Sequence, residues 1–372
     1  MIIGNAKVYL DGSFREASVT VENGKIVAIG PANVLCDVDA AGRYLVPGFI
    51  DIHTHGAMGE DFSDGKAEGM EKMSRYYAAN GVTSFLATTM TLKEKTLLPA
   101  METVRDFHRP ADGAKCAGIH LEGPFLCYAK RGAQAAENLH APDADMLRRL
   151  NEASGGNVRL VTIAPEEPGA VEFIRQVSKV CAVSVGHTEA DYDTALAAYE
   201  AGATHATHLF NCMPALLHRA PGVIGAVCDS SATAELICDG LHVHPAAIRA
   251  AYKLFGKNLV VISDSLRCAG MPDGEYELGG QTIEMKNGKA TLLGSNTLAG
   301  SSTNLLQEVR NLVSYGISLE DAVYAVSEAP AKAVRLDARI GKIAPGMDAD
   351  LLILNEDLSL HSVYIDGKAV VI

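Results

Sequence analysis

The chain of 372 residues has no long apolar run, few positive charges and no Cys-x-x-Cys motif. No stretch approaches the ~20 apolar residues of a membrane helix, and the first residues lead into strand-like sequence without a signal peptide. With 32 basic against 45 acidic residues, the formal charge of −13 argues against nucleic acid or an anionic membrane as partner. Since several of the eight cysteines lie inside apolar runs, we expect reduced thiols and a cytoplasmic protein.

Short β-rich apolar runs alternate with longer segments of helical spacing between residues 48 and about 340. The expected strands are 48–55, 81–89, 116–122, 158–164, 180–187, 203–209, 234–239 and 258–264. The clearest expected helices are 67–79, 143–153, 169–179, 190–201 and 245–255. This alternation predicts an α/β fold, a closed parallel (β/α)8 TIM-type barrel. A doubly wound open sheet is the alternative, but no Gly-rich phosphate loop follows the first strand.

The two ends of the chain have a different pattern. Residues 1–47 and 345–372 contain short alternating strands with turns such as Asn23-Gly24 and Asp366-Gly367, which are typical of hairpins. Because neither piece is long enough to fold alone, we expect a small β-sandwich domain formed by both termini, outside a barrel domain of residues 48–344. A further β-like stretch at about 274–295 predicts a hairpin insertion, either on the barrel rim or packed toward the β domain.

Polar and ionisable residues gather where six of the expected strands stop, and this is the active end of such barrels. They are His53 and His55, Glu122, His187, His208 and Asn211, Asp239 and His242, and Asp264. Each of these taken singly is often structural, but six strand ends at one pole indicate a site. Within His53-Thr-His55 both imidazoles lie on one side of an extended strand, because side chains alternate along it.

Imidazole and carboxylate ligands without a thiolate favour zinc, iron, manganese or cobalt. Glu122, His187 and His208 form a three-ligand set that leaves one coordination position open. His53 and His55, near Asp264, are able to hold a second ion with Glu122 as a bridge. Such an ion makes water a usable nucleophile near neutral pH, and a carboxylate such as Asp264 acts as base and then as acid. The site therefore predicts hydrolysis of an amide or a related C–N bond, with one or two divalent ions as cofactor.

Several blocks together resemble a known family. They are Pro47-Gly-Phe-Ile-Asp-Ile-His-Thr-His-Gly, His120-Leu-Glu-Gly-Pro-Phe, Gly186-His-Thr, Thr207-His-Leu-Phe-Asn-Cys-Met and Asp239-Gly-Leu-His. In these blocks the chain resembles the N-acetylglucosamine-6-phosphate deacetylases of the amidohydrolase superfamily, and the match runs through essentially its whole length. The resemblance implies metal-dependent removal of the acetyl group from N-acetyl-D-glucosamine 6-phosphate, in amino-sugar catabolism.

Three alternatives stay open. The first two are an N-acetylgalactosamine-6-phosphate deacetylase and another amidohydrolase, such as a cyclic-amide hydrolase. Enzymes of the latter kind usually carry a carboxylated lysine at the position of Glu122. The third is a non-catalytic sugar-phosphate sensor, and the presence of Asp264 weighs against it because a binding protein needs no proton shuttle.

The resemblance also implies roles for individual residues. Glu122, His187 and His208 match the main metal ligands, the pair His53 and His55 matches the two-metal members, and Asp264 matches the proton-shuttling aspartate. The positions implied to contact substrate are Ala133, Gln134, Asn211, Cys212, Arg219, His242, Leu298, Ala299 and Gly300. The arginine matches one that binds phosphate from the neighbouring subunit, which implies a homodimer, and a guanidinium fits phosphate bidentately.

Some positions depart from the family pattern or invite a plainer interpretation. Gln134 stands where the family often has a histidine; we expect this change to affect sugar contacts and not the metal site. Cys212 replaces a commoner alanine, and we expect only its backbone to contact the sugar. His205 is expected to face a helix, and His120 to be either a neighbour of the metal ligands or a bystander.

Overall fold

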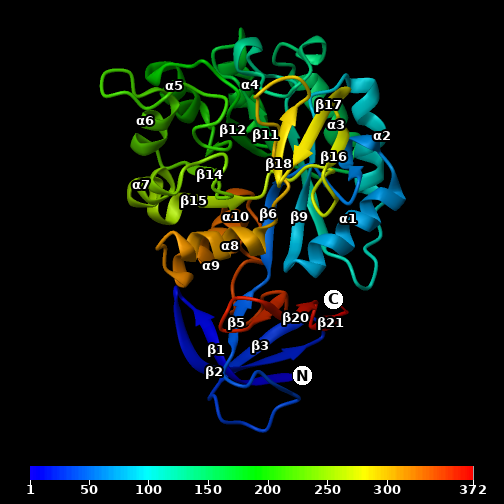
Figure 1. Ribbon diagram of the computed structural model, residues 1–372, viewed down its shortest axis with the longest axis vertical. Helices are drawn as coiled ribbons and strands as arrows, with labels where there is room; N and C mark the ends of the chain where they lie inside the picture. Colours follow the sequence, from blue (N-terminus) through cyan, green and yellow to red (C-terminus); the bar gives the residue numbers. More distant parts are fainter. Residues whose placement is uncertain (372) are drawn as a thin grey trace.

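The computed structural model describes residues 1–371, and its centre is a parallel barrel (Figure 1). The strand order is β15-β14-β13-β12-β11-β10-β9-β6. In chain order these strands are β6 (Phe49–Thr54), β9 (Val82–Thr89), β10 (Lys115–Glu122), β11 (Val158–Ile163), β12 (Ala182–Val185), β13 (His205–Ala206), β14 (Thr233–Ile237) and β15 (Leu259–Ile262). The Asp264 N–H donates to the His53 carbonyl at 2.9 Å and joins the last strand to the first. The predicted barrel is therefore confirmed.

Helices surround the barrel and bury apolar faces against its strands. They are α1 (Ala67–Ala79), α2 (Glu94–Arg105), α3 (Ala144–Ala153), α4 (Ala170–Val177), α5 (Tyr192–Ala201), α6 (Gly222–Asp229), α7 (Pro245–Phe255), α8 (Leu305–Ser314), α9 (Leu319–Val326) and α10 (Glu328–Ala333). Four 3-10 turns are η1 (Phe62–Asp64), η2 (Tyr128–Lys130), η3 (Ala136–Asn138) and η4 (Gly256–Asn258). Asp191 caps α5 by accepting from the Thr194 N–H at 2.9 Å, as the cap preference predicts. Among the described residues, no helix is long and apolar enough to span a membrane.

Three barrel strands are shorter than their apolar patterns indicate. The expected strands 180–187, 203–209 and 258–264 are reduced to β12, β13 and β15, because the chain turns away just before the functional side chains. His187 and His208 adopt positive φ angles of 50° and 24°, and Asp264 adopts 49°. A left-handed conformation costs about 1–3 kcal/mol for a residue other than glycine. These three side chains thus lie on strained bends directly beyond the strands.

Strands from both termini form one sheet outside the barrel, at the lower end of Figure 1. Its order is β21-β20-β19-β5-β1-β2-β3, with β4 beside β1. These strands are β1 (Ile2–Leu10), β2 (Ser13–Glu22), β3 (Lys25–Gly30), β4 (Val38–Asp39), β5 (Tyr44–Pro47), β19 (Leu351–Leu354), β20 (Leu360–Ile365) and β21 (Lys368–Val370). The sheet encloses a core of its own, which includes Val8, Val19 and Leu351. A separate β domain built from both termini is confirmed.

A smaller sheet lies on the rim of the barrel. It consists of β16 (Gly274–Leu278), β17 (Gln281–Lys286) and β18 (Lys289–Leu292), so the expected hairpin has a third strand. Leu278 and Ile283 pack with Met90 and Leu266 in one apolar cluster. Of the two placements considered, the structure shows the rim, away from the terminal β domain (Figure 1). A two-stranded ribbon, β7 (Gly56–Ala57) with β8 (Glu60–Asp61), follows the first barrel strand.

An interdomain ion cluster joins the start of β10 to the terminal β domain. It consists of Lys115 and the carboxylates of Asp348, Asp350 and Asp366. The Lys115 Nζ atom lies 3.2 Å, 3.0 Å and 2.5 Å from their oxygens, respectively. Burial alone lowers the pKa of Lys115, but Asp350 and the other carboxylates outweigh it, and the net pKa is raised. Lys115 therefore stays positively charged between the two domains at neutral pH.

Candidate active site

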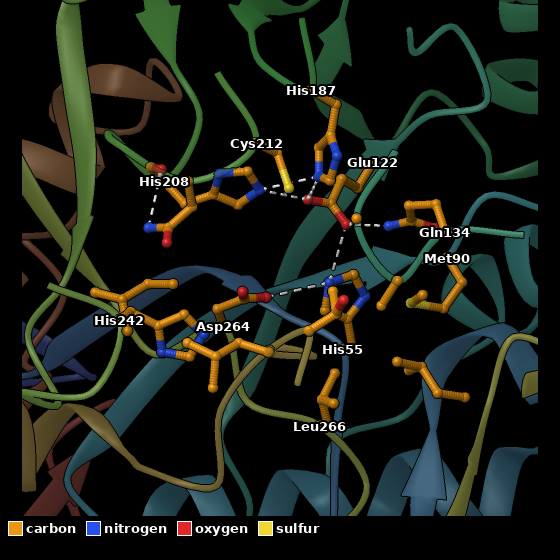
Figure 2. Close-up of a pocket in the computed structure, with 18 residues that line it drawn as sticks. His55, Met90, Glu122, Gln134, His187, His208, Cys212, His242, Asp264 and Leu266 are labelled. Atoms are coloured by element: carbon orange, nitrogen blue, oxygen red, sulfur yellow. Dashed lines mark hydrogen bonds and ion pairs between the residues drawn. The ribbon is translucent and has the colours of Figure 1, made fainter. Parts of the chain in front are cut away.

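Glu122, His187 and His208 converge at the carboxyl end of the barrel (Figure 2). Glu122 is the last residue of β10, and the two histidines follow β12 and β13. Both histidine Nε2 atoms lie 3.1 Å from Glu122 Oε1 and 3.0 Å from each other. Three ligand atoms this close together, all buried, match the surroundings of one divalent ion with bonds of about 2.0–2.2 Å.

His53, His55 and Asp264 form a second group on the other side of Glu122. The Nε2 atoms of His53 and His55 lie 3.5 Å and 3.4 Å from Asp264 Oδ1. His53 Nε2 also lies 3.3 Å from Glu122 Oε1, and His55 Nε2 lies 3.3 Å from Glu122 Oε2. His53 Nε2 is buried and has no hydrogen-bond partner among the described residues. Since an orphaned buried nitrogen is costly, this donor set fits a divalent metal, with Glu122 between two ion positions.

The carboxylates of this site are held in their charged form. Burial alone raises the pKa of Glu122, but His53, His187 and His208 outweigh it and hold the pKa well below its usual value. For Asp264, burial again raises the pKa, and the imidazoles of His53 and His55 bring it below the ordinary aspartate value. Both groups are therefore anionic at neutral pH, a state suited to binding a metal ion or accepting a proton.

A cavity of about 200 Å³ opens in front of these ligands. It is lined by His55, Met90, Glu122, Gly132, Ala133, Gln134, His187, His208, Asn211, Cys212, Ile237, His242, Asp264, Leu266, Leu278, Thr297, Leu298 and Gly300. Two of the expected substrate contacts are absent from this lining. Ala299 is buried and packs in the apolar cluster of the rim sheet, with Met90 and Leu266. Arg219 is exposed on the loop before α6.

Gln134 contacts Glu122, an expected metal ligand, so the expectation that the change at this position leaves the metal site untouched is wrong. Its Oε1 accepts from the Thr91 N–H at 2.8 Å, and its Nε2 donates to Glu122 Oε2 at 2.5 Å. The first contact fixes which end of the amide faces Glu122, so the side chain presents a donor to the carboxylate. Because Thr91 and Gln134 are 43 residues apart, no local pattern in the sequence indicates this contact.

His242 faces the cavity and is paired with Asp239 behind it. The ring Nδ1 atom lies 2.8 Å from Asp239 Oδ2. Although burial lowers the pKa of His242, the hydrogen bond and charge of Asp239 outweigh it and raise the pKa above its usual value. The pairing leaves Nε2 free, and the raised pKa favours a hydrogen on that atom. His242 is thereby suited to donate a hydrogen bond into the cavity.

A polar layer beneath the metal ligands was not predicted from the sequence. Its centre is Glu235 on β14, which lies close to His53, His120 and His205. The expectation that His205 faces a helix is wrong, since its Nε2 lies 3.0 Å from Glu235 Oε1 inside the barrel. His120 neighbours the ligands: its ring centroid is 4.5 Å from that of His53. The sequence does contain one indication of this layer, a glutamate inside the apolar run Ala234-Glu-Leu-Ile. Because unpaired charges are rarely buried, such a glutamate indicates polar partners inside the barrel.

The amidohydrolase family model matches residues 44–370. The chain belongs to the amidohydrolase family. This amidohydrolase is 38% identical to the N-acetylglucosamine-6-phosphate deacetylase of Bacillus subtilis (strain 168) over 325 residues, which are 85% of this chain and 82% of that relative. It is 34% identical to the N-acetylgalactosamine-6-phosphate deacetylase of Escherichia coli O157:H7 over 363 residues, 96% of either protein.

The solved structures agree with the sequence comparison. The N-acetyl-D-glucosamine-6-phosphate deacetylase of Mycobacterium smegmatis superposes on this amidohydrolase with a TM-score of 0.93 at 34% identity, covering 100% of both chains. A mutant of that protein in complex with N-acetyl-D-glucosamine-6-phosphate gives a TM-score of 0.94. The resemblance to the sugar-phosphate deacetylases, which the sequence motifs indicated, is confirmed.

Proposed function

We propose that this amidohydrolase hydrolyses the acetamide of N-acetyl-D-glucosamine 6-phosphate to acetate and D-glucosamine 6-phosphate, as a step of amino-sugar catabolism. The observation that carries the proposal is the position of Asp264, an ionised carboxylate that lines the cavity beside the metal ligands. The galacto epimer is the second candidate, because one of the similar proteins is a deacetylase of N-acetylgalactosamine 6-phosphate. The two substrates are epimers, which differ only in the configuration of a single carbon that carries a hydroxyl group.

The metal site and Asp264 support a direct hydrolytic route. A divalent ion held by Glu122, His187 and His208 would lower the pKa of water and polarise the acetyl carbonyl. Asp264 accepts the proton that the attacking water loses, and passes it to the sugar nitrogen as the C–N bond breaks. His242 donates a hydrogen bond to the oxygen on which negative charge develops. Atoms balance, since one water molecule is added across the C–N bond.

The phosphate requires a cation that the cavity does not supply. Neither lysine nor arginine is among the described residues that line it. Arg219 lies on an exposed loop with the half-exposed Leu216 and Leu217, where a second subunit has access to it. These features support a homodimer in which Arg219 binds the phosphate in the neighbouring active site, and a guanidinium supplies two parallel hydrogen bonds to phosphate.

Cofactor identity and compartment complete the proposal. Zinc, iron(II) and manganese all suit a site made of imidazole and carboxylate ligands, with His53 and His55 completing a second position. All eight cysteines are free, which supports a reducing compartment, the cytoplasm.

Acetate release by the purified protein, supplied with each of the three ions in turn, tests the proposal. N-acetyl-D-glucosamine 6-phosphate and its galacto epimer are compared at equal concentration. We expect turnover in the range of ~1–10³ s⁻¹ with the gluco substrate and a lower kcat/KM with the galacto epimer. The reverse order would assign the enzyme to the galacto substrate, and release from neither would exclude both.

A further inference from the structure

We infer that Glu235 is the positioning residue that makes His53 a metal ligand. Glu235 is fully buried on β14, and its Oε2 lies 2.9 Å from His53 Nδ1. A carboxylate only accepts hydrogen bonds, so in a neutral imidazole this contact places the hydrogen on Nδ1. The lone pair is then on Nε2, the atom that faces Glu122 and Asp264.

Glu235 is itself held in one orientation. Its Oε1 lies 3.0 Å from His205 Nε2, and His205 Nδ1 lies 2.6 Å from Thr233 Oγ1. Both carboxylate oxygens therefore have fixed partners, in a row that runs from Thr233 through His205 and Glu235 to His53. A polar row that is fully paired is rigid, and this rigidity reaches the His53 ring.

The same carboxylate also supports the other group of ligands. Glu235 Oε2 accepts from the His208 backbone N–H at 3.2 Å. His208 is the residue with a φ of 24°, an unfavourable conformation that needs support from its surroundings. One buried glutamate thus touches a ligand from each of the two groups, His53 through its ring and His208 through its backbone.

The consequence is a difference in how the two ion positions depend on Glu235. His187 and Glu122 do not contact it, so the position at Glu122, His187 and His208 keeps most of its support without it. The position at His53 and His55 loses the group that selects the ligand nitrogen of His53. Loss of a partner of this kind typically lowers metal affinity about 10- to 100-fold.

The test is a cobalt(II) titration of metal-free protein, followed by visible absorbance, with metal content measured after dialysis. We expect two ions per wild-type chain. Glu235→Leu should weaken the second ion by about 10- to 100-fold and leave the first within a few-fold. Glu235→Gln keeps an oxygen acceptor of the same shape, so its affinity for the second ion should lie between those of wild type and Glu235→Leu. This variant also provides the test if Glu235→Leu does not fold.

Glu308→Leu is the matched control. Glu308 is equally buried and accepts a backbone N–H, that of Cys238, but touches none of the ligands. It should lower the melting temperature and leave both cobalt affinities unchanged. The inference is overturned if Glu235→Leu binds both ions as tightly as wild type does, if wild type takes a single ion, or if Glu308→Leu has the same effect on the second ion.

The inference rests on the metal site of the proposed function, but not on the substrate. Because ion binding is measured without any sugar, a failure of the deacetylase assay would leave the titration interpretable. Conversely, an active deacetylase whose second ion does not depend on Glu235 would contradict the inference alone.

Discussion

The two ends of strand β10 carry two clusters of charged side chains, and the two clusters balance their carboxylates in different ways. At its start, Lys115 lies among Asp348, Asp350 and Asp366; at its end, Glu122 lies among histidines and beside Asp264. Lys115 and Glu122 are the first and last of the eight residues of this strand, so seven steps of ~3.3 Å separate them by about 23 Å. Both clusters gather carboxylates in the interior, where unpaired charge is costly.

The difference lies in where the positive charge comes from. In the interdomain cluster the positive charge comes from side chains of the protein. Asp348, for example, has Lys25 at 2.6 Å and Arg339 at 2.8 Å in addition to Lys115. In the active site the partners are imidazoles, which bind metal only when neutral. That cluster therefore depends on an ion from solution. A charge built into the chain holds two domains together permanently, whereas a charge supplied by an ion leaves coordination positions for chemistry.

Asp264→Asn gives the largest effect on function that this comparison predicts. The amide keeps the size of the side chain but cannot accept a proton, so kcat should fall about 10²- to 10⁴-fold. Acetate release measures the loss. The ion at Glu122, His187 and His208 should stay bound and the melting temperature should stay close to wild type, because Asp264 belongs to the other group of ligands. Activity within a few-fold of wild type would remove Asp264 from its role as proton shuttle.

Lys115→Met tests the other cluster, and should act on stability alone. It removes the shared cation, but Asp348 keeps Lys25 and Arg339 and Asp366 keeps Arg109. Since mainly the buried Asp350 loses its partner, the cost should be about 1–3 kcal/mol, measured by denaturant unfolding. Activity per folded molecule should be unchanged. If activity falls while stability does not, the two clusters are not independent.

The pH dependence of this loss sharpens the test. The pKa of Lys115 is raised in the folded protein, so its contribution is complete below the unfolded lysine pKa of about 10.4. It is lost as pH rises through the higher folded value. The stability difference between wild type and Lys115→Met should therefore be constant from neutral pH to about pH 10 and shrink above it.

Arg219→Ala should raise KM for the phosphorylated substrate about ten- to a hundredfold, because hydrogen bonds to charged groups are worth about 1.5–3 kcal/mol. The exposed Arg175→Ala on α4 is the control for loss of a surface charge. Co-expression of Arg219→Ala with Asp264→Asn decides whether the arginine acts across subunits. If the site is shared, about half of the dimers are mixed and each holds one intact site of two, so about a quarter of wild-type activity should be recovered. No recovery would place Arg219 in the site of its own chain.

Gln134→His should have the smallest effect, a five- to tenfold loss in kcat/KM. A neutral imidazole also has one acceptor and one donor, but its Nδ1 lies one bond nearer the backbone than the amide oxygen. We therefore expect one of the two hydrogen bonds to be lost, which is worth about 1 kcal/mol. Cobalt titration beside the activity assay separates a changed metal site from a changed sugar contact. An unchanged metal affinity with a higher KM would mean that Gln134 acts on the sugar alone.

The sequence allowed the barrel, the terminal β domain and most cavity residues to be predicted, because each depends on a local pattern. Apolar runs mark strands, and a histidine or carboxylate at the end of such a run marks the active pole. The contacts of Glu235, Gln134 and His205 depend instead on pairs that only the closed barrel brings together. Strand ends at His187 and His208 were misjudged because the positive φ angles that end them have no signature in an apolar run.

Strand β5 pairs on one side with β1 and on the other with β19. About 300 residues separate β5 from β19 along the chain. At a synthesis rate of ~5–20 residues per second, β19 leaves the ribosome roughly 15–60 s after β5. The barrel is thus synthesised while one edge of β5 still lacks its partner, and open strand edges promote association between chains. We therefore expect the unpaired edge of β5 to be open to pairing with other chains until β19 has been synthesised.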